Sequence, residues 1–137
     1  MTPPSELPVE DVVRVAEFRA ALRQFLRRSE RTARSSGLTP QRHLLLLMIK
    51  GAPDLSQQST VTELAARLQL AQSTVTELVR RAEEAGLVER EQSANDARVA
   101  HLRLSDEGER RLASAFTNLA RERADLRDAF GHLDATL

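Results

Sequence analysis

The sequence predicts a mainly helical α+β domain in which one short β-hairpin follows two closely spaced helices. Apolar residues recur at helical spacing through most of the chain, and two short segments of this kind, residues 60–68 and 72–85, are separated by a three-residue turn. A segment of alternating polarity with turn residues at its centre follows at residues 87–104. Two short helices and a hairpin in this order predict a winged helix-turn-helix, an arrangement typical of DNA-binding proteins.

The composition bounds the class of protein. The chain has 137 residues, 20 basic and 20 acidic side chains, and no cysteine. This length predicts one domain with a core of its own, and the lack of cysteine excludes a disulfide framework and a thiol redox sensor. No apolar stretch approaches the roughly 20 residues of a membrane helix. Because no signal-peptide pattern precedes the first helix, we expect a cytoplasmic protein.

Residues 8 to about 34 are predicted to form a long first helix. Pro8 suits its first turn, and the run from Ser35 to Gly37 ends it. Near its C-terminal end, where cations favour the helix dipole, stand Arg27, Arg28, Arg31 and Arg34. This cluster is either a solvated helix end or a surface that contacts phosphate groups.

A second helix is expected from Thr39, which caps it, to Gly51. Pro40 at the first helical position strengthens this start signal. Residues 44–49 are six consecutive apolar residues, which predicts a helix buried nearly all round. A polar loop follows at residues 53–59.

The third helix begins with a capping box, in which Thr60 and Glu63 each satisfy a backbone N–H. Its apolar stripe consists of Val61, Leu64, Ala65 and Leu68. Residues 69–71 then form the turn, with Leu70 available for the core.

The fourth helix is predicted to be the recognition helix, which Gly86 ends. It buries Val75, Leu78, Val79 and Ala82. Short hydroxyl side chains near its start and arginines further along suit entry into a major groove. Together with Thr60, the residues expected to contact DNA here are Gln72, Ser73, Thr74, Thr76, Glu77, Arg80 and Arg81.

Ion pairs on this helix leave a second interpretation open. Glu77 and Arg81 stand four residues apart, as do Arg80 and Glu84, and such pairs are typical of an ordinary surface helix. They would hold the arginines away from DNA in the free protein. Glu77 either accepts a hydrogen bond from a cytosine amino group or only orients Arg80.

Residues 87–104 are expected to form the wing, a hairpin with strands at 87–91 and 99–104. Its expected DNA contacts are Arg90, Asn95, Asp96 and Arg98. Arg98 lies near the tip, where it reaches an adjacent minor groove or a phosphate. Alternatively, Asp96 and Arg98 form a salt bridge that only shapes the turn.

Ser105 caps a long last helix that is expected to run from Asp106 to about Leu126. Residues 127–137 then form a short terminal helix or a tail, which Gly131 weakens. The apolar faces of the first and last helices exceed what one small winged domain buries alone, which indicates an interface with a second subunit.

The run DARVAHLRLSDEG, residues 96–108, resembles the D-x-R-x5-L-[ST]-x-x-G signature of the MarR family of bacterial regulators. The matching positions are Asp96, Arg98, Leu104, Ser105 and Gly108. Residues 74–90, TVTELVRRAEEAGLVER, also resemble the recognition helix and first wing strand of that family. The resemblance implies a transcription regulator, expected to be a repressor, that binds a pseudo-palindromic operator in double-stranded DNA as a homodimer. It also implies that Asp96 steadies the arginine that enters the minor groove.

In this family the terminal helices interlock two subunits. The resemblance therefore implies that residues 8–36 and 106–137 of the single domain mediate dimerisation and that residues 39–104 form its DNA-binding part. The expected dimerisation residues are Val12, Leu22, Phe25, Phe116, Leu119, Phe130 and Leu133. A small effector would bind near the junction of the first, second and fifth helices and release DNA. His43 is either a core or interface histidine or a contact to that effector.

The net charge of the predicted DNA-binding segment supports an alternative hypothesis for the function. Residues 60–104 contain six arginines and seven acids, a net charge of −1. Because nucleic-acid binders usually carry a basic patch, a winged protein-interaction module without DNA readout is the alternative hypothesis. No nucleophile elbow, paired carboxylates or glycine-rich phosphate loop indicates an enzyme. The three histidines stand far apart without metal-ligand spacing, so we expect no metal or other cofactor.

Overall fold

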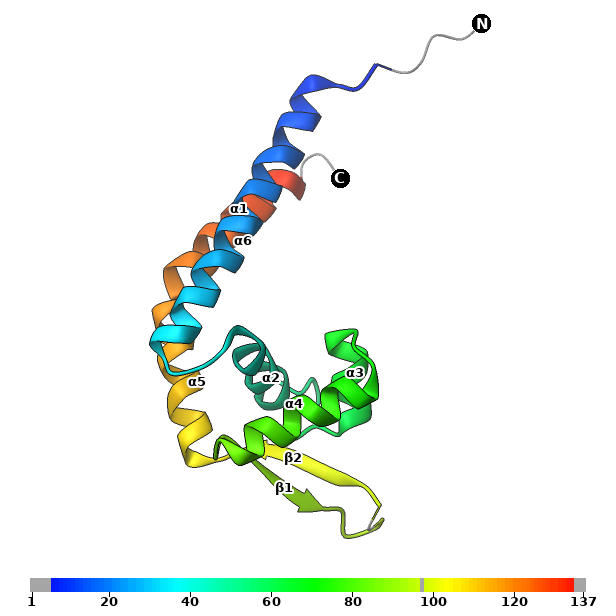
Figure 1. Cartoon of the computed structure of the whole chain (residues 1–137). Helices are drawn as coiled ribbons and strands as arrows, with labels where there is room; N and C mark the ends of the chain where they lie inside the picture. The colour runs from blue at the N-terminus through cyan, green and yellow to red at the C-terminus, as the bar shows by residue number, and fades with distance from the viewer. Residues whose placement is uncertain (1–5, 97, 135–137) are drawn as a thin grey trace, which may run out of the picture.

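The computed structural model describes residues 6–96 and 98–134. Its elements are α1 (Val9–Ser35), α2 (Pro40–Lys50), α3 (Val61–Leu68), α4 (Gln72–Glu84), β1 (Val88–Gln92), β2 (Ala100–Leu104), α5 (Asp106–Asn118) and α6 (Ala120–Asp134). α1 and α6 form an arm that rises from a winged lobe made of α2, α3, α4 and the hairpin, and α5 joins the two parts (Figure 1). This mainly helical fold with one hairpin confirms the predicted fold class.

α2 is the central helix of the winged lobe, since it contacts α3, α4 and β2 as well as α1 and α5. The largest fully buried apolar side chains of the core are Leu45, Leu46, Ile49, Leu64, Val75, Val79, Leu87 and Leu102. The expectation that α2 is buried nearly all round is wrong, because Leu44 and Leu47 are 44% and 37% exposed. The lobe covers one side of α2, and the other side opens onto a hollow beside the arm.

Local capping chemistry sets the start of α3 and the turn after it. Thr60 Oγ1 accepts from the Glu63 backbone N–H, and Glu63 Oε1 accepts from that of Thr60, both at 3.2 Å, which confirms the capping box. Gln69 ends the helix in a left-handed conformation with φ 55°. This residue reverses the chain and leaves Leu70 40% exposed, so the prediction that Leu70 joins the core is wrong.

The hairpin is antiparallel and pairs Val88 with Leu104 and Gln92 with Ala100. Its inner edge is covered by Ser59, whose N–H donates to the Leu102 carbonyl at 3.0 Å and whose carbonyl accepts from the Leu102 N–H at 2.8 Å. Ser59 is therefore buried at 2% exposure, although the sequence places it in a polar loop. These two bonds attach the wing to the body of the lobe.

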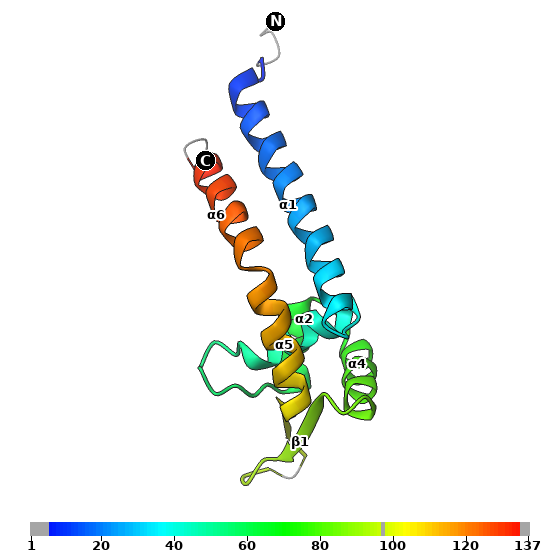
Figure 2. The ribbon, with the colours of Figure 1, turned by 90° about the vertical axis from the view of Figure 1, so that its left-hand side faces the viewer.

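In the arm, α1 and α6 lie side by side and run in opposite directions (Figures 1 and 2). The Phe18 and Phe130 rings meet edge to face with centroids 5.9 Å apart, and Leu133 is buried in the same packing. α1 continues past the end of α6 (Figure 2). In the N-terminal part of α1, Val12 and Val15 are 45% and 43% exposed.

The predicted single helix from Asp106 to about Leu126 is wrong, because the chain breaks at Leu119, with φ −103° and ψ 6°. The break lies where the chain passes from lobe to arm, and α6 then continues to Asp134 in place of a short helix or tail. Leu112, Ala115 and Leu119 are all buried, so the apolar stripe runs through the break and gives no sign of it. Ala97 of the predicted wing and residues 135–137 of the predicted terminal segment lie outside the described residues, as do residues 1–5.

Neither a membrane-spanning helix nor a metal-binding cluster is found among residues 6–96 and 98–134. None of their helices combines the length and apolar character that crossing a membrane requires. Within the same ranges, no group of three or more His, Cys, Asp or Glu side chains is arranged to hold a metal ion.

Candidate nucleic-acid interface

α4 presents one continuous exposed face to solvent. Its buried side, made of Val75, Val79 and Ala82, fixes the rotation of the helix against the lobe. The opposite face carries the predicted contact residues, of which Gln72, Ser73, Thr74, Thr76, Arg80 and Arg81 are exposed and Glu77 is half-buried. The sequence pattern therefore placed these side chains on the correct face, with short polar groups at the N-terminal half and arginines beyond them.

Glu77 is the centre of an ion-pair network on this face. Its carboxylate accepts from Arg80 Nε at 2.9 Å and from Arg81 Nε at 3.1 Å, while Arg80 also pairs with Glu84. The hydrogen bond from Arg80, followed by that from Arg81, lowers the pKa of Glu77 to about 2. Both arginines of α4 are thus held by carboxylates of their own helix, as the sequence-based ion-pair interpretation predicted.

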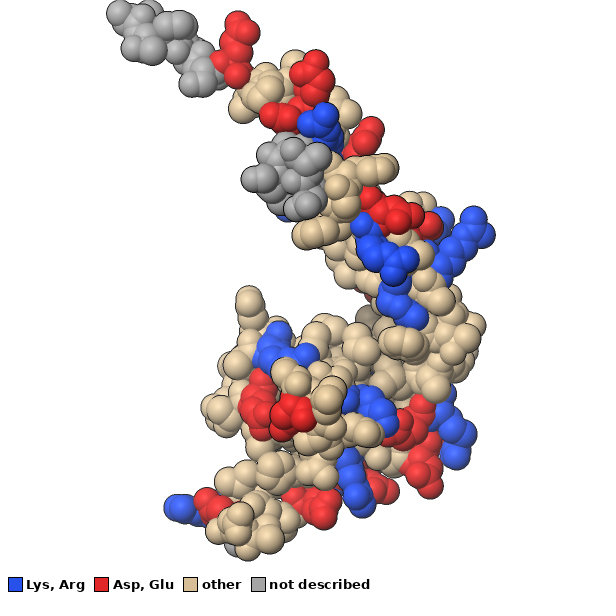
Figure 3. Space-filling model, turned by 180° about the vertical axis from the view of Figure 1, so that it is seen from behind, with Lys and Arg blue, Asp and Glu red and all other residues tan. Residues whose placement is uncertain are grey.

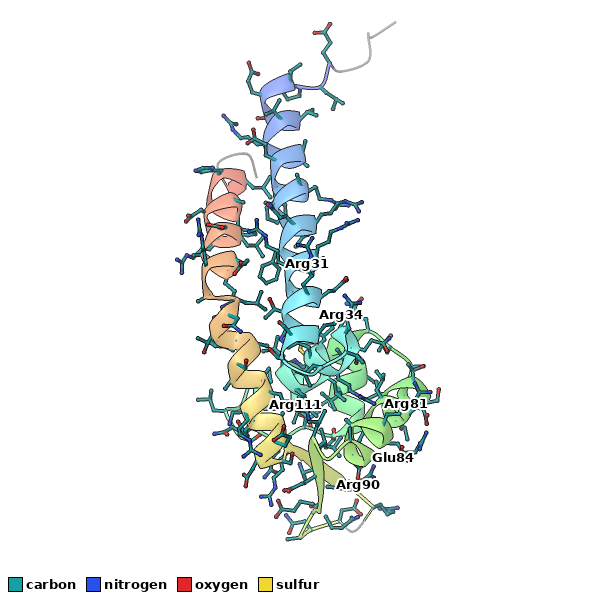
Figure 4. The ribbon with its side chains drawn as sticks, turned by 60° about the vertical axis from the view of Figure 1, so that its left-hand side comes forward. Arg31, Arg34, Arg81, Glu84, Arg90 and Arg111 are labelled. Atoms are coloured by element: carbon teal, nitrogen blue, oxygen red, sulfur yellow. The ribbon has the colours of Figure 1, made fainter. Side chains whose placement is uncertain are left out.

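The arginines of the wing strands are also paired. Arg90 Nη2 donates to Glu83 Oε1 of α4 at 2.8 Å, which raises the pKa of the guanidinium and ties β1 to the recognition helix. Arg103 on β2 lies 3.4 Å from Glu89 and 3.5 Å from Glu91 across the hairpin. Figure 4 shows Arg81, Glu84 and Arg90 on the same side of the lobe. These pairs explain why the lobe has no net basic surface.

The wing tip is organised by Asp96. Asp96 Oδ1 accepts from the Arg98 backbone N–H at 3.0 Å and from Arg98 Nε at 3.2 Å, and the backbone bond is the main reason that the Asp96 pKa is lowered. The Arg98 side chain is nevertheless 91% exposed, and Asn95 is exposed beside it. Asp96 therefore shapes the turn and at the same time leaves Arg98 exposed to solvent. A salt bridge within the turn and an exposed arginine, which the sequence offered as alternatives, are both present.

Thr60 has a structural partner that the sequence also predicted. Its hydroxyl is engaged with Glu63 in the capping box, donating to Glu63 Oε1 at 2.9 Å. In the first turn of α3, the Thr62 hydroxyl accepts from Gln72 Nε2 at 3.5 Å, which links the starts of α3 and α4. Thr60 acts as the N-cap of α3, and a DNA contact from it would reuse a hydroxyl that the cap already engages.

The last residues of the signature at residues 96–108 attach the wing to α5. Ser105 Oγ donates to the Gly86 carbonyl at 2.6 Å and accepts from the Gly108 N–H at 3.1 Å, while the Ser105 N–H donates to the Leu87 carbonyl at 2.9 Å. A Cβ atom at Gly108 would stand 2.2 Å from that Leu87 oxygen. Only glycine permits this approach, so this part of the signature fixes the base of the wing.

A cavity of about 350 Å³ lies at the junction of α1, α2 and α5, and six of its lining residues are Phe25, Leu26, His43, Leu44, Leu47 and Phe116. His43 is 7% exposed, and burial lowers the pKa of its imidazole, which favours the neutral form. His43 is therefore a buried residue that also forms part of the cavity wall. Sequence reasoning missed Leu44 and Leu47 as cavity residues, although their i,i+3 spacing within the apolar run marks one shared face.

The expected dimerisation residues divide by exposure. Phe116 and Phe130 are each 53% exposed and Val12 is 45% exposed, whereas Leu119 and Leu133 are 3% and 7% exposed within the single chain. Arg123 stacks on the Phe116 ring, with its guanidinium carbon 3.8 Å from the centroid. Leu22 and Phe25 are half-buried, and Phe25 also lines the junction cavity. The surface free for a partner is therefore concentrated on the outer part of α1 and on the exposed phenylalanines.

The charges of the two parts of the molecule are distributed differently. Seen from behind, acidic and basic atoms alternate over the winged lobe, while basic atoms gather on the arm close to the lobe and acidic atoms are prominent nearer its free end (Figure 3). On α4 and the wing, ion pairs likewise place Arg80 and Arg90 beside carboxylates.

Comparison with known proteins agrees with this geometry. A model of the MarR family matches residues 36–99, which spans the start of α2 to the wing tip. The solved structure of a MarR family transcription regulator superposes with a TM-score of 0.69 at 23% identity, covering 89% of this chain and 78% of that one. Sco3205, a MarR family transcriptional regulator from Streptomyces coelicolor in complex with DNA, has a TM-score of 0.65 at 23% identity and coverages of 94% and 78%.

A third structural relative is a mutant of MepR from S. aureus bound to an oligodeoxyribonucleotide, with a TM-score of 0.66 at 18% identity, covering 90% of this chain and 84% of that one. No curated protein matches the sequence. The structural likenesses establish the fold, and the family match covers the residues that form the recognition helix and most of the wing. Residues 36–99 thus match the MarR family model, and the chain has the fold of solved MarR family regulators.

Proposed function

We propose that the chain is a DNA-binding transcription regulator that binds a pseudo-palindromic operator as a homodimer. The observation that carries this proposal is the arrangement of α4, which exposes a face of short polar side chains and arginines while the wing holds Arg98 fully out in solvent beside it. A helix of this kind fits a major groove, and a wing arginine fits the adjacent minor groove or phosphates. Sco3205 and MepR, which share the fold, are described in complexes with DNA and an oligodeoxyribonucleotide.

The proposed DNA contacts are those that the sequence singled out. Base edges are assigned to the exposed N-terminal half of α4, and phosphates to the arginines further along it and to the wing. The proposed residues are Thr60, Gln72, Ser73, Thr74, Thr76, Glu77, Arg80, Arg81, Arg90, Asn95, Asp96 and Arg98. Because Glu77 and Glu83 hold Arg80, Arg81 and Arg90 in the free protein, these arginines must exchange carboxylate partners for phosphates on binding.

The proposed division of labour follows the shape of the molecule. Residues 39–104 form the DNA-reading lobe, and the segments 8–36 and 106–137 join two subunits through exposed apolar side chains of the arm. A repressor with this build works in the cytoplasm, and we assign no catalytic reaction to it. The junction cavity between arm and lobe is the proposed effector site, since a ligand there contacts both parts and can change their angle.

The direct test is a mobility-shift titration of the purified protein against its own promoter and against operators selected from random DNA fragments. We expect a selected sequence with two half-sites about one helical turn apart, bound at least a thousandfold more tightly than random DNA at physiological salt. Failure to select any sequence, combined with capture of a protein partner on the α4 face, would instead support the winged protein-interaction module. Residues 60–104 carry a net charge of −1, which is why the experiment allows for this second outcome.

Removing the wing arginine is expected to weaken binding without changing sequence preference. In Arg98→Ala the exposed guanidinium is lost while Asp96 still caps the turn through the Arg98 backbone N–H. Affinity should fall by a similar factor for operator and random DNA, and the slope of log K against log salt should drop by about one unit. Loss of preference at a single base position would show that Arg98 reads a base edge.

Glu77→Gln is expected to tighten binding to every DNA sequence. The change removes a carboxylate whose charge repels phosphates and which holds Arg80 and Arg81. Its pKa of about 2 means that Glu77 is fully ionised across the range in which DNA binding is measured. The affinities of wild type and variant for operator and random DNA, measured at two salt concentrations, test this expectation. A loss of about 1–3 kcal/mol confined to one base pair would mean that Glu77 accepts from a cytosine.

A further inference from the structure

Two hollows of different chemistry share a wall at the junction of arm and lobe. The first is the cavity of about 350 Å³ already described, and the second is an open hollow of about 480 Å³ along the C-terminal half of α1. Leu26 and Glu30 line both of them. A single elongated molecule can therefore occupy the two hollows continuously.

The first hollow is suited to an apolar group. Leu26, Leu44, Leu47 and Phe116 on its wall are 51%, 44%, 37% and 53% exposed, which is unusual for four large apolar side chains gathered at one place. Its volume lies in the range of about 300–1,000 Å³ that holds small ligands. Burying these side chains against an apolar ligand removes them from water and supplies the main driving force for binding.

The second hollow is suited to negative charge spread over some distance. Arg23, Arg27, Arg31 and Arg34 line it at steps of four, four and three residues, so they form one row on α1. The row extends about 16 Å along the helix axis. Figure 4 shows Arg31 and Arg34 on the last turns of α1, next to the winged lobe.

These four arginines differ from those of the DNA-reading face. Arg80, Arg81 and Arg90 are each held by a carboxylate, whereas none of the four in the row forms a salt bridge with any described residue. Among the described residues, Glu30 is the single acid that lines the same hollow, so the hollow keeps a net charge of +3 (four positive charges and one negative). Unpaired guanidinium groups in a row bind phosphate oxygens in bidentate fashion.

We propose that the junction binds an amphiphilic phosphate ester, with an acyl or aryl body in the apolar cavity and a head that bears two or more phosphate groups along the arginine row. Acyl-coenzyme A thioesters belong to this chemical class. A single carboxylate would engage only one or two of the four arginines, whereas several phosphates match the length of the row. The inference deepens the proposed effector site and rests on the proposed function only for the effect on DNA, because binding of the ligand itself requires no DNA.

The test is titration calorimetry of the full chain with decanoyl-coenzyme A below its micelle concentration, with coenzyme A alone and decanoate as the two half-ligands. We expect decanoyl-coenzyme A to bind at least tenfold more tightly than either half, with an affinity that falls as salt rises. Arg27→Gln with Arg31→Gln should weaken this binding roughly tenfold, since each partly exposed pair contributes modestly. The matched control is Arg121→Gln with Arg127→Gln on α6, which changes the net charge equally and should leave binding unaltered.

Two further variants separate the two halves of the site. Leu44→Gln should reduce the advantage of decanoyl-coenzyme A over coenzyme A, while Glu30→Gln should tighten both by removing the only acid of the row. Coenzyme A binding as tightly as its decanoyl ester, decanoate binding as tightly as the ester, or no binding of any of the three would each overturn the proposal. A mobility shift with the selected operator and no ligand tests the DNA-binding function independently, so the two failures are distinguishable.

Discussion

Replacing Val12 and Val15 with aspartate is expected to yield monomers that bind the operator on the order of a hundredfold more weakly than the wild type. Both valines stand on the part of α1 near its free end, at 45% and 43% exposure, so the change leaves the core of each chain intact. In the proposed dimer they become buried, and two aspartates there would carry unpaired charges into an apolar interface. A lone lobe then reads one half-site without the local concentration that its partner provides.

Sedimentation velocity of wild type and variant, followed by operator titration, measures both effects. The control is Leu55→Asp, which removes an apolar side chain that is 85% exposed in the loop between α2 and α3. It should leave the dimer and its DNA affinity unchanged. A wild-type protein that sediments as a stable monomer, or a double variant that remains dimeric, would contradict the proposed role of the arm.

Gly108→Ala is expected to lower the free energy of unfolding by about 2 kcal/mol, because overpacking costs up to about 3 kcal/mol and alanine returns about 1 kcal/mol of helix propensity. The new methyl group would stand 2.2 Å from the Leu87 carbonyl oxygen, so the first turn of α5 must move away from β1. That movement strains the bonds from Ser105 to Gly86 and to Leu87 at the base of the wing. Operator affinity should fall as well, since the wing loses its fixed position.

Gly131→Ala is the matched control for this effect. It also lies inside a helix, but apart from the neighbouring backbone of that helix no atom of the described residues stands within 4 Å of the position that its Cβ would take. Urea unfolding at one fixed protein concentration should therefore show a small gain, on the order of 0.5–1 kcal/mol, for Gly131→Ala and a clear loss for Gly108→Ala. Equal stability of the two variants would mean that α5 can shift freely against the wing.

Local chemistry within a few residues determined much of this protein, and the sequence shows it directly. The capping box of Thr60 and Glu63, the buried stripe of α4 and the Asp96–Arg98 contact all join residues close together in the chain. The helical period fixes which side chains of α4 face solvent, so its candidate contacts were predictable. The ion pairs of Glu77 followed from the same spacing.

Only the tertiary structure decided the features that depend on distant segments. Leu44 and Leu47 are exposed because the lobe covers one side of α2, and Ser59 is buried because it pairs with Leu102. The break at Leu119 lies where α5 leaves the lobe, and an apolar stripe that continues through it carries no local signal. The period of a helix shows which of its faces is apolar, whereas the element that covers that face is set by packing between segments far apart in the sequence. The walls of the junction cavity, and the position of the arginine row beside it, are therefore visible only in the folded chain.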